Sequence, residues 1–171
     1  MTETNTSSKL SLPALLGYCA TILVLVGVDQ WSKAWVLSKL PEGKAVTVLP
    51  HILQFRYVTN TGAAFSVFSG RTLLLAGLTA VILVGAVLLL VLGKIPGRLN
   101  QAALVLMVAG GVGNLIDRIA RHFVVDFIEV LFTDFAVFNF ADCCVTVGAA
   151  VLILTTVISF IRELREPKDQ R

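Results

Sequence analysis

The sequence predicts an all-α membrane protein with four transmembrane helices and a small extracytoplasmic β element. Of its 171 residues, 56% are hydrophobic and 15% are charged, whereas soluble domains carry about 25% charged residues. Charged residues enclose four apolar stretches of 19, 22, 18 and 19 residues, at 10–28, 72–93, 99–116 and 143–161. A helix needs roughly 20 such residues to cross about 30 Å of hydrocarbon. Because lipid offers no hydrogen-bond partners, the backbone N–H and C=O groups must pair with one another there.

These stretches form one membrane-embedded domain spanning residues 1–171. The polar, Ser- and Thr-rich start is expected to be a flexible cytoplasmic tail over 1–11. A basic residue followed by an apolar run also resembles a cleavable signal peptide, but no small-residue cleavage site ends this run, so it is assigned as the first span. The four spans are expected at about 13–37, 71–93, 99–120 and 141–163.

Two connections are expected on the outer side. Over residues 53–57, apolar and polar side chains alternate with the period of a strand, and a Thr-Asn-Thr-Gly turn follows. This places a β element at about 45–69. Residues 121–140 are interpreted as a second outer loop, with a flexible part at 121–136.

The orientation follows from the distribution of Lys and Arg. Four crossings put both termini on one side, which carries seven of these residues against six on the other. Lys and Arg are concentrated in the turn at 94–98 and in the C-terminal tail, whereas on the other side they are spread over long loops. Both termini are therefore expected to be cytoplasmic. The net charge of +3 suits basic flanks beside anionic lipid, and no basic patch indicates nucleic acid.

Polar and ionisable residues at membrane depth are costly, so each is a hypothesis for a functional site. They gather toward the outer ends of the predicted helices, where they can converge: Asp29, Lys33, Asn114, Asp117, Arg118, Asp126, Asn139 and Asp142.

Several of these residues also have structural explanations. Asp29 and Lys33 have the spacing of a helix ion pair. The glycine run at 110–113 has no preceding strand, so close helix packing explains it better than a nucleotide loop. Asp117 beside Arg118 is equally consistent with a structural ion pair and with a site role.

Asp126 and Asp142 are the stronger candidates for catalytic residues. Each is surrounded by apolar residues, and neither has Lys or Arg within three positions. When two such carboxyls share a site, their pKa values separate. One can then act as an acid and the other as a base on an amide. The alternatives are a helix N-cap for Asp142 and loop solvation for Asp126. No zinc-type spacing of His or Cys is present, so zinc hydrolysis is not expected, although Asp-only metal binding stays open.

Five segments, in order, resemble the bacterial lipoprotein signal peptidase (signal peptidase II) family. They span about 29–142 and read DQWSK from Asp29, NTGAAFS from Asn60, GGVGNLIDR ending at Arg118, VVDF around Asp126 and FNFAD ending at Asp142. The visible departure is the Cys143-Cys144 pair, where the family commonly has hydroxyl or small residues.

The resemblance implies an aspartyl endopeptidase of the bacterial cytoplasmic (inner) membrane. It would remove signal peptides from diacylglyceryl-modified prolipoproteins, cutting N-terminal to the lipid-modified cysteine on the periplasmic side. It also implies membrane lipid as a partner, inhibition by globomycin-type peptides and no cofactor; a monomer is expected. Asp126 and Asp142 would be catalytic, and the supporting or substrate-binding residues would be Asp29, Lys33, Asn60, Gly62, Asn114, Asp117, Arg118, Asn139 and Ala141.

Two further expectations follow. Asp142 would open the last helix, where the helix dipole favours negative charge, whereas Asp126 would lie on a mobile loop. Asp142 is therefore expected to be the ionised base and Asp126 to hold the proton. The alternative function is a small four-span proton- or cation-coupled transporter, in which the same acids would form a relay.

Overall fold

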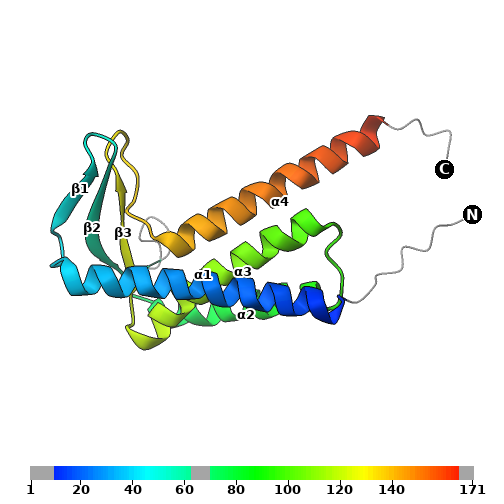
Figure 1. Ribbon diagram of the computed structural model, residues 1–171, viewed down its shortest axis with the longest axis horizontal. Coiled ribbons are helices and arrows are strands. Elements are labelled where there is room, and N and C mark those ends of the chain that lie inside the picture. Colours follow the sequence, from blue (N-terminus) through cyan, green and yellow to red (C-terminus); the bar gives the residue numbers. More distant parts are fainter. Residues whose placement is uncertain (1–9, 63–69, 166–171) are drawn as a thin grey trace, which may run out of the picture.

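The computed structural model describes residues 10–62 and 70–165, which form four long helices and one small sheet. The sheet lies at one end of the helices (Figure 1). All four helices are long and apolar enough to cross a membrane, so the chain is a multi-pass membrane protein. Their bounds differ from the expected spans by at most two residues: α1 Leu12–Lys39, α2 Thr72–Val91, α3 Arg98–Ala120 and α4 Phe140–Arg165.

The start of α1, the α2–α3 turn and the end of α4 lie at the end of the molecule away from the sheet (Figure 1). The turn is tight because Gly93 and Gly97 take positive φ angles of 66° and 80°, which glycine adopts without strain. Most of the expected N-terminal tail, residues 1–9, is outside the described residues.

Helix α3 is the central helix and contacts the other three. Within its most apolar window 44% of the residues are buried, against 6%, 17% and 11% for α1, α2 and α4. The outer three helices therefore present leucine, isoleucine and valine side chains outward, as a bilayer requires.

The glycine run of α3 is a packing surface, as expected. A side chain on Gly110 would collide with the backbone oxygen of Ala141 and with Val145. A Cβ on Gly113 would lie 2.5 Å from Oδ2 of Asp29. These glycines bring α1 and α4 against α3 at the level of the predicted site.

The sheet is antiparallel with strand order β1-β2-β3. Strands β1 (Ala45–Leu49) and β2 (Leu53–Asn60) are the predicted β element, although its later part, residues 63–69, is outside the described residues. The third strand, β3 (Val124–Val130), corrects the expectation of a loop throughout 121–140. Its seven residues are mostly β-branched or aromatic, and the strand pairs with β2 at both ends, with a shift in register between Phe55 and Val58.

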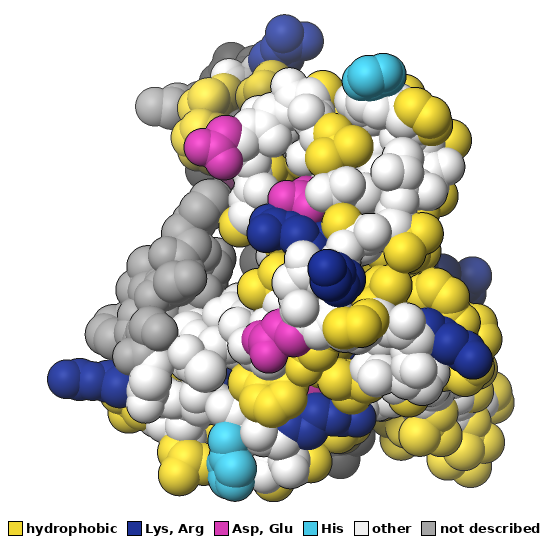
Figure 2. All heavy atoms as spheres, turned by 90° about the vertical axis from the view of Figure 1, so that its left-hand side faces the viewer, with side chains coloured by type: hydrophobic (Ala, Val, Ile, Leu, Met, Phe, Trp, Pro, Cys, Tyr) yellow, Lys and Arg dark blue, Asp and Glu magenta, His cyan; other side chains and the backbone are white. Residues whose placement is uncertain are grey.

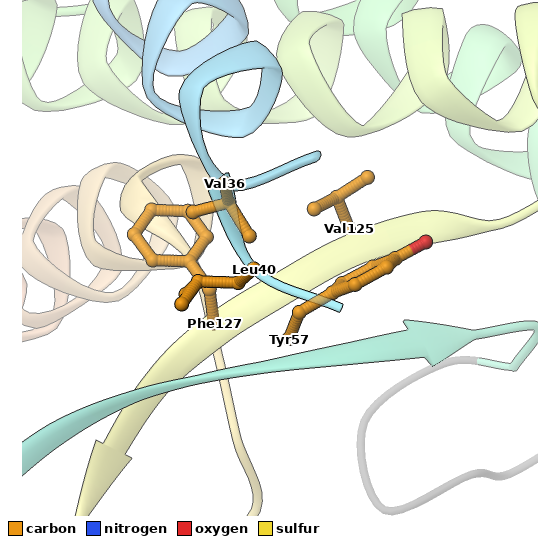
Figure 3. Packing of buried hydrophobic residues seen from close by; sticks show 5 residues of the cluster. All are labelled: Val36, Leu40, Tyr57, Val125 and Phe127. Atoms are coloured by element: carbon orange, nitrogen blue, oxygen red, sulfur yellow. The ribbon is translucent and has the colours of Figure 1, made fainter. Parts of the chain in front are cut away.

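An apolar cluster fixes the sheet to the end of α1. It consists of Val36, Leu40, Tyr57, Val125 and Phe127, and Figure 3 shows these side chains between α1 and strands β2 and β3. Packing thus holds Val125 and Phe127, the two neighbours of Asp126 in β3.

The other side of the sheet is polar. Arg56 and Glu129 form an ion pair at 2.7 Å, and Gln54 donates to the same carboxylate at 2.5 Å. Figure 2 shows charged side chains of both signs among hydrophobic ones over this end of the molecule. This mixed surface is suited to contact with water.

Candidate active site

The structure brings Asp126 and Asp142 to one cavity of about 400 Å³ between the sheet and the helices. Asp126 lies in β3, and Asp142 lies in the first turn of α4. A segment missed by the sequence prediction, 135–138, forms one wall, because the backbone of Phe138 pairs with that of Ile128. The lining residues are Asn60, Asn114, Arg118, Val124, Asp126, Phe135, Ala136, Val137, Phe138, Asp142, Cys143, Val145 and Thr146.

Asn139 caps helix α4. Its Oδ1 accepts the backbone N–H of Asp142 at 3.0 Å, and Oδ2 of Asp142 accepts the backbone N–H of Asn139 at 3.1 Å. This reciprocal arrangement is a capping box. The alternative of Asp142 as the N-cap is therefore wrong, but the acid still lies in the first turn, where unpaired N–H groups and the helix dipole favour negative charge.

Two asparagine side chains connect the acids. Nδ2 of Asn139 donates to Oδ1 of Asp126 at 2.7 Å and to Oδ1 of Asn114 at 3.1 Å. Nδ2 of Asn114 in turn donates to Oδ1 of Asp142 at 2.8 Å. The two carboxyls thus belong to one hydrogen-bond network, although they are sixteen positions apart in the sequence.

The electrostatic setting of Asp126 favours its protonated form. Burial, followed by the negative charge of Asp142, raises the pKa of Asp126 to about 6. Hydrogen bonds from Asn60, at 2.8 Å, and from Asn139 act in the opposite direction. Asp126 also lies in a paired strand, so the expectation of a mobile loop at this residue was wrong.

Arg118 reaches the cavity from α3. Its guanidinium donates to the backbone oxygens of Gly62 at 3.1 Å and of Asn114 at 3.4 Å. Gly62 in turn donates its backbone N–H to Oδ1 of Asn60 at 2.9 Å, so the arginine supports the segment that contacts Asp126. Among the described residues Nε of Arg118 is buried without a hydrogen-bond partner.

A second polar group lies behind the cavity, around Lys33. The expected ion pair with Asp29 is present at 2.9 Å, and Lys33 also contacts Asp117 at 3.0 Å. Asp117 pairs in addition with Arg121, so its alternative assignment as a partner of Arg118 was wrong. Gln30 joins this group by donating to Asp29 and to Asp117. The sequence analysis had not singled out Arg121 or Gln30.

A second, apolar cavity of about 330 Å³ adjoins the first. Asn114, Arg118, Asp142 and Val145 line both. Its remaining walls are supplied by α2 and α3 within the membrane-spanning region: Thr79, Ile82, Leu83, Ala86, Leu104, Met107, Val108 and Gly111. Asp142 therefore lies where the two cavities meet, whereas Asp126 lines only the first.

Paired carboxyls of this kind can perform acid–base catalysis without a metal. One carboxylate can take a proton from water while the other, protonated, gives one to the reacting amide. Within residues 10–62 and 70–165, no three His, Cys, Asp or Glu side chains are grouped so that they could hold a metal ion.

The comparisons with known proteins agree with this chemistry. The family model for signal peptidase (SPase) II matches residues 21–158. A lipoprotein signal peptidase of Streptococcus thermophilus is 37% identical over 133 residues, covering 78% of this chain and 87% of that protein. One from a Nostoc species is 41% identical over 130 residues, covering 76% and 82%.

Two solved structures of bacterial membrane enzymes share the fold. The first has a TM-score of 0.83 and 27% identity, covering 93% of this chain and 96% of that one. The second has a TM-score of 0.77 and 28% identity, covering 89% and 97%.

Fold, site and relatives together define a membrane-spanning aspartic protease. Its substrates are prolipoproteins. The chain belongs to the signal peptidase II family, the lipoprotein signal peptidases. The alternative of a small ion-coupled transporter is not favoured.

Proposed function

We propose that Asp126 and Asp142 are the catalytic pair and that the substrate is a prolipoprotein whose cysteine already carries diacylglyceryl. The cut would fall on the N-terminal side of that cysteine. The observation that carries the proposal is the meeting of the two cavities at Asp142. A lipid-modified peptide has a polar scissile bond beside long apolar chains, and this site offers a matching environment for each part.

The proposed roles follow from the surroundings of the two acids. Asp142 takes a proton from water, which attacks the carbonyl carbon, because its place in the first turn of α4 favours the charged form. Asp126 gives its proton to the carbonyl oxygen, because burial raises its pKa to about 6. When the C–N bond breaks, Asp142 gives its proton to the departing nitrogen and a hydroxyl of the tetrahedral intermediate returns one to Asp126, so the pair regains its starting state.

The remaining assignments are proposals of the same kind. Asn60, Asn114 and Asn139 would orient the acids, and Arg118 with Gly62 would bind the substrate backbone. Asp29, Lys33, Asp117 and Ala141 would support the site. The enzyme would be a monomer in the lipid of the bacterial inner membrane, with cytoplasmic termini, a periplasmic site and sensitivity to globomycin-type peptides. Supporting the orientation, the basic 94–98 turn lies at the end away from the sheet.

The test uses purified protein in detergent with a lipobox peptide bearing either a diacylglyceryl-modified or a free cysteine. We expect cleavage of the modified peptide alone, and no turnover by Asp126→Asn or Asp142→Asn. Asp134→Asn is the matched control, because this exposed acid lies on the β3–α4 connection outside the cavity lining. Turnover by either dyad variant would remove that residue from the mechanism, and equal cleavage of both peptides would refute the substrate assignment.

A further inference from the structure

Two buried acids outside the cavity lining each contact the backbone immediately before a catalytic aspartate. Oδ2 of Asp117 accepts the N–H of Val125 at 3.1 Å, and Oδ1 of Asp29 accepts the N–H of Ala141 at 3.0 Å. Val125 precedes Asp126, and Ala141 precedes Asp142 in the sequence. Both supporting acids are at most 1% exposed. Each therefore fixes the backbone from which one member of the pair extends.

Lys33 connects these two acids. Its ammonium group contacts Oδ2 of Asp29 at 2.9 Å, Oδ2 of Asp117 at 3.0 Å and Oδ1 of Asn114 at 2.9 Å. An ammonium has three N–H donors and no acceptor, so these contacts use its whole capacity. With Arg121 also paired to Asp117, the buried group has two cations for two anions. It is electrically balanced without either member of the catalytic pair.

The lysine also sets the direction of the Asn114 amide. Because Lys33 can only donate, it requires the oxygen of that amide to face it. The N–H₂ group then faces Asp142, to which it donates at 2.8 Å. The same oxygen accepts an N–H of the Asn139 side-chain amide, which also donates to Asp126. The direction of the hydrogen bonds between the two catalytic acids is thus determined at Lys33.

We infer that Lys33, Asp29 and Asp117 are positioning residues for the catalytic pair. The two acids hold the backbone before each catalytic aspartate, and the lysine orients Asn114 so that it donates to Asp142. This inference rests on the proposed function of Asp126 and Asp142. A purely structural role would leave the catalytic step intact in any variant that folds and binds substrate.

The main test is the double variant Lys33→Met/Asp29→Asn, compared with Lys33→Met alone. The single variant leaves an unpaired buried carboxylate and is expected to unfold at a markedly lower temperature. The double variant keeps Arg121 with Asp117 and restores the charge balance, so its unfolding temperature should recover. Its kcat should nevertheless stay about 100-fold below the parent value with KM within about threefold, because a small misplacement of reacting groups costs this much.

The control for a lost buried interaction is Tyr18→Phe. It removes a 2.7 Å hydrogen bond to Gln101 that also joins α1 to α3, far from the site. This variant should lower the unfolding temperature without lowering kcat. A double variant that recovers both stability and kcat would overturn the inference, because the group would then only hold helices together.

A milder perturbation decides the matter if the double variant does not fold. In Gly113→Ala the added Cβ would lie 2.5 Å from Oδ2 of Asp29, whereas Gly85→Ala on α2 meets no atom within 4 Å. Gly113→Ala should lower kcat at unchanged KM, and Gly85→Ala should match the parent. Parent-like kcat in Gly113→Ala would contradict the inference. An inactive parent, or an active Asp126→Asn variant, would instead refute the proposed function.

Discussion

Replacing Asp126 with asparagine should abolish cleavage and at the same time stabilise the folded protein at neutral pH. The pKa of this carboxyl rises from its ordinary value of 3.8 to about 6, chiefly through burial. That difference corresponds to about 3 kcal/mol, which the folded state loses once the acid ionises. A neutral amide avoids this cost, so the active site is stabilised by the same change that removes its acid.

Part of the gain is offset by hydrogen bonding. Both oxygens of Asp126 accept an amide N–H, one from Asn60 and one from Asn139. An asparagine side chain has only one acceptor oxygen, so one of these contacts would bring two donors together and cost about 1–2 kcal/mol. A net stabilisation of about 1–2 kcal/mol remains at pH 7.5.

The sign of the effect depends on pH in a defined way. Between the unfolded pKa of 3.8 and the folded value of about 6, the folded state holds more protons, so parent stability falls as pH rises. The advantage of Asp126→Asn is therefore complete above pH 6 and absent near pH 4. Thermal unfolding in detergent at pH 7.5 and pH 4, with peptide cleavage measured alongside, tests this. A variant less stable than its parent at pH 7.5, or equally favoured at both pH values, would refute the reasoning.

Three other outcomes are expected. The kcat/KM of the parent should fall as pH rises through about 6, because the free enzyme then loses the proton of Asp126; a rise through the same range would show that the ionised form is the active one. Cleavage should persist in EDTA, since the proposed chemistry uses only carboxyls, and loss that added metal restores would overturn it. A reporter fused after Arg171 should be active only in the cytoplasm, and periplasmic activity would reverse the proposed orientation.

The four spans were predictable because lipid imposes one strong constraint. A stretch near 20 residues without charge has few alternatives to a membrane-crossing helix, and the four expected spans match the helices within two residues. The catalytic candidates were predictable for a related reason. Carboxyls such as Asp126 and Asp142 are rarely placed among apolar residues unless something requires them there.

Strand β3 was missed because its strongest signal is not local. The segment Val124–Val130 has strand-favouring residues, but its partner β2 lies more than sixty residues earlier in the chain. Sheet propensity depends on such partners. Asp126 was consequently assigned to a mobile loop, whereas pairing with Val58 and the packing of Val125 and Phe127 hold it in place.

The side chains that accept the backbone N–H groups of Val125 and Ala141 could not be predicted from the sequence either. Nothing in the chain near Ala141 indicates that its N–H meets Asp29, which is over a hundred positions away. Similarly, Arg121 looks like an ordinary basic helix end until Asp117 is seen to contact both it and Lys33. Such contacts depend on helix packing, which the glycines of α3 permit but do not specify.

Three buried acids, Asp29, Asp117 and Asp126, and the half-buried Asp142 divide into two classes according to the charge beside them. Asp29 and Asp117 contact Lys33, so their charge is compensated and they belong to the framework. Asp126 and Asp142 receive hydrogen bonds from asparagine side chains and from one backbone N–H, and no cation forms an ion pair with them among the described residues. Two charges at this site are disfavoured, because burial and then the negative charge of Asp142 raise the pKa of Asp126. The ammonium group of Lys33 is paired with Asp29 and Asp117 instead. In the proposed mechanism, Asp126 and Asp142 can therefore exchange a proton with substrate.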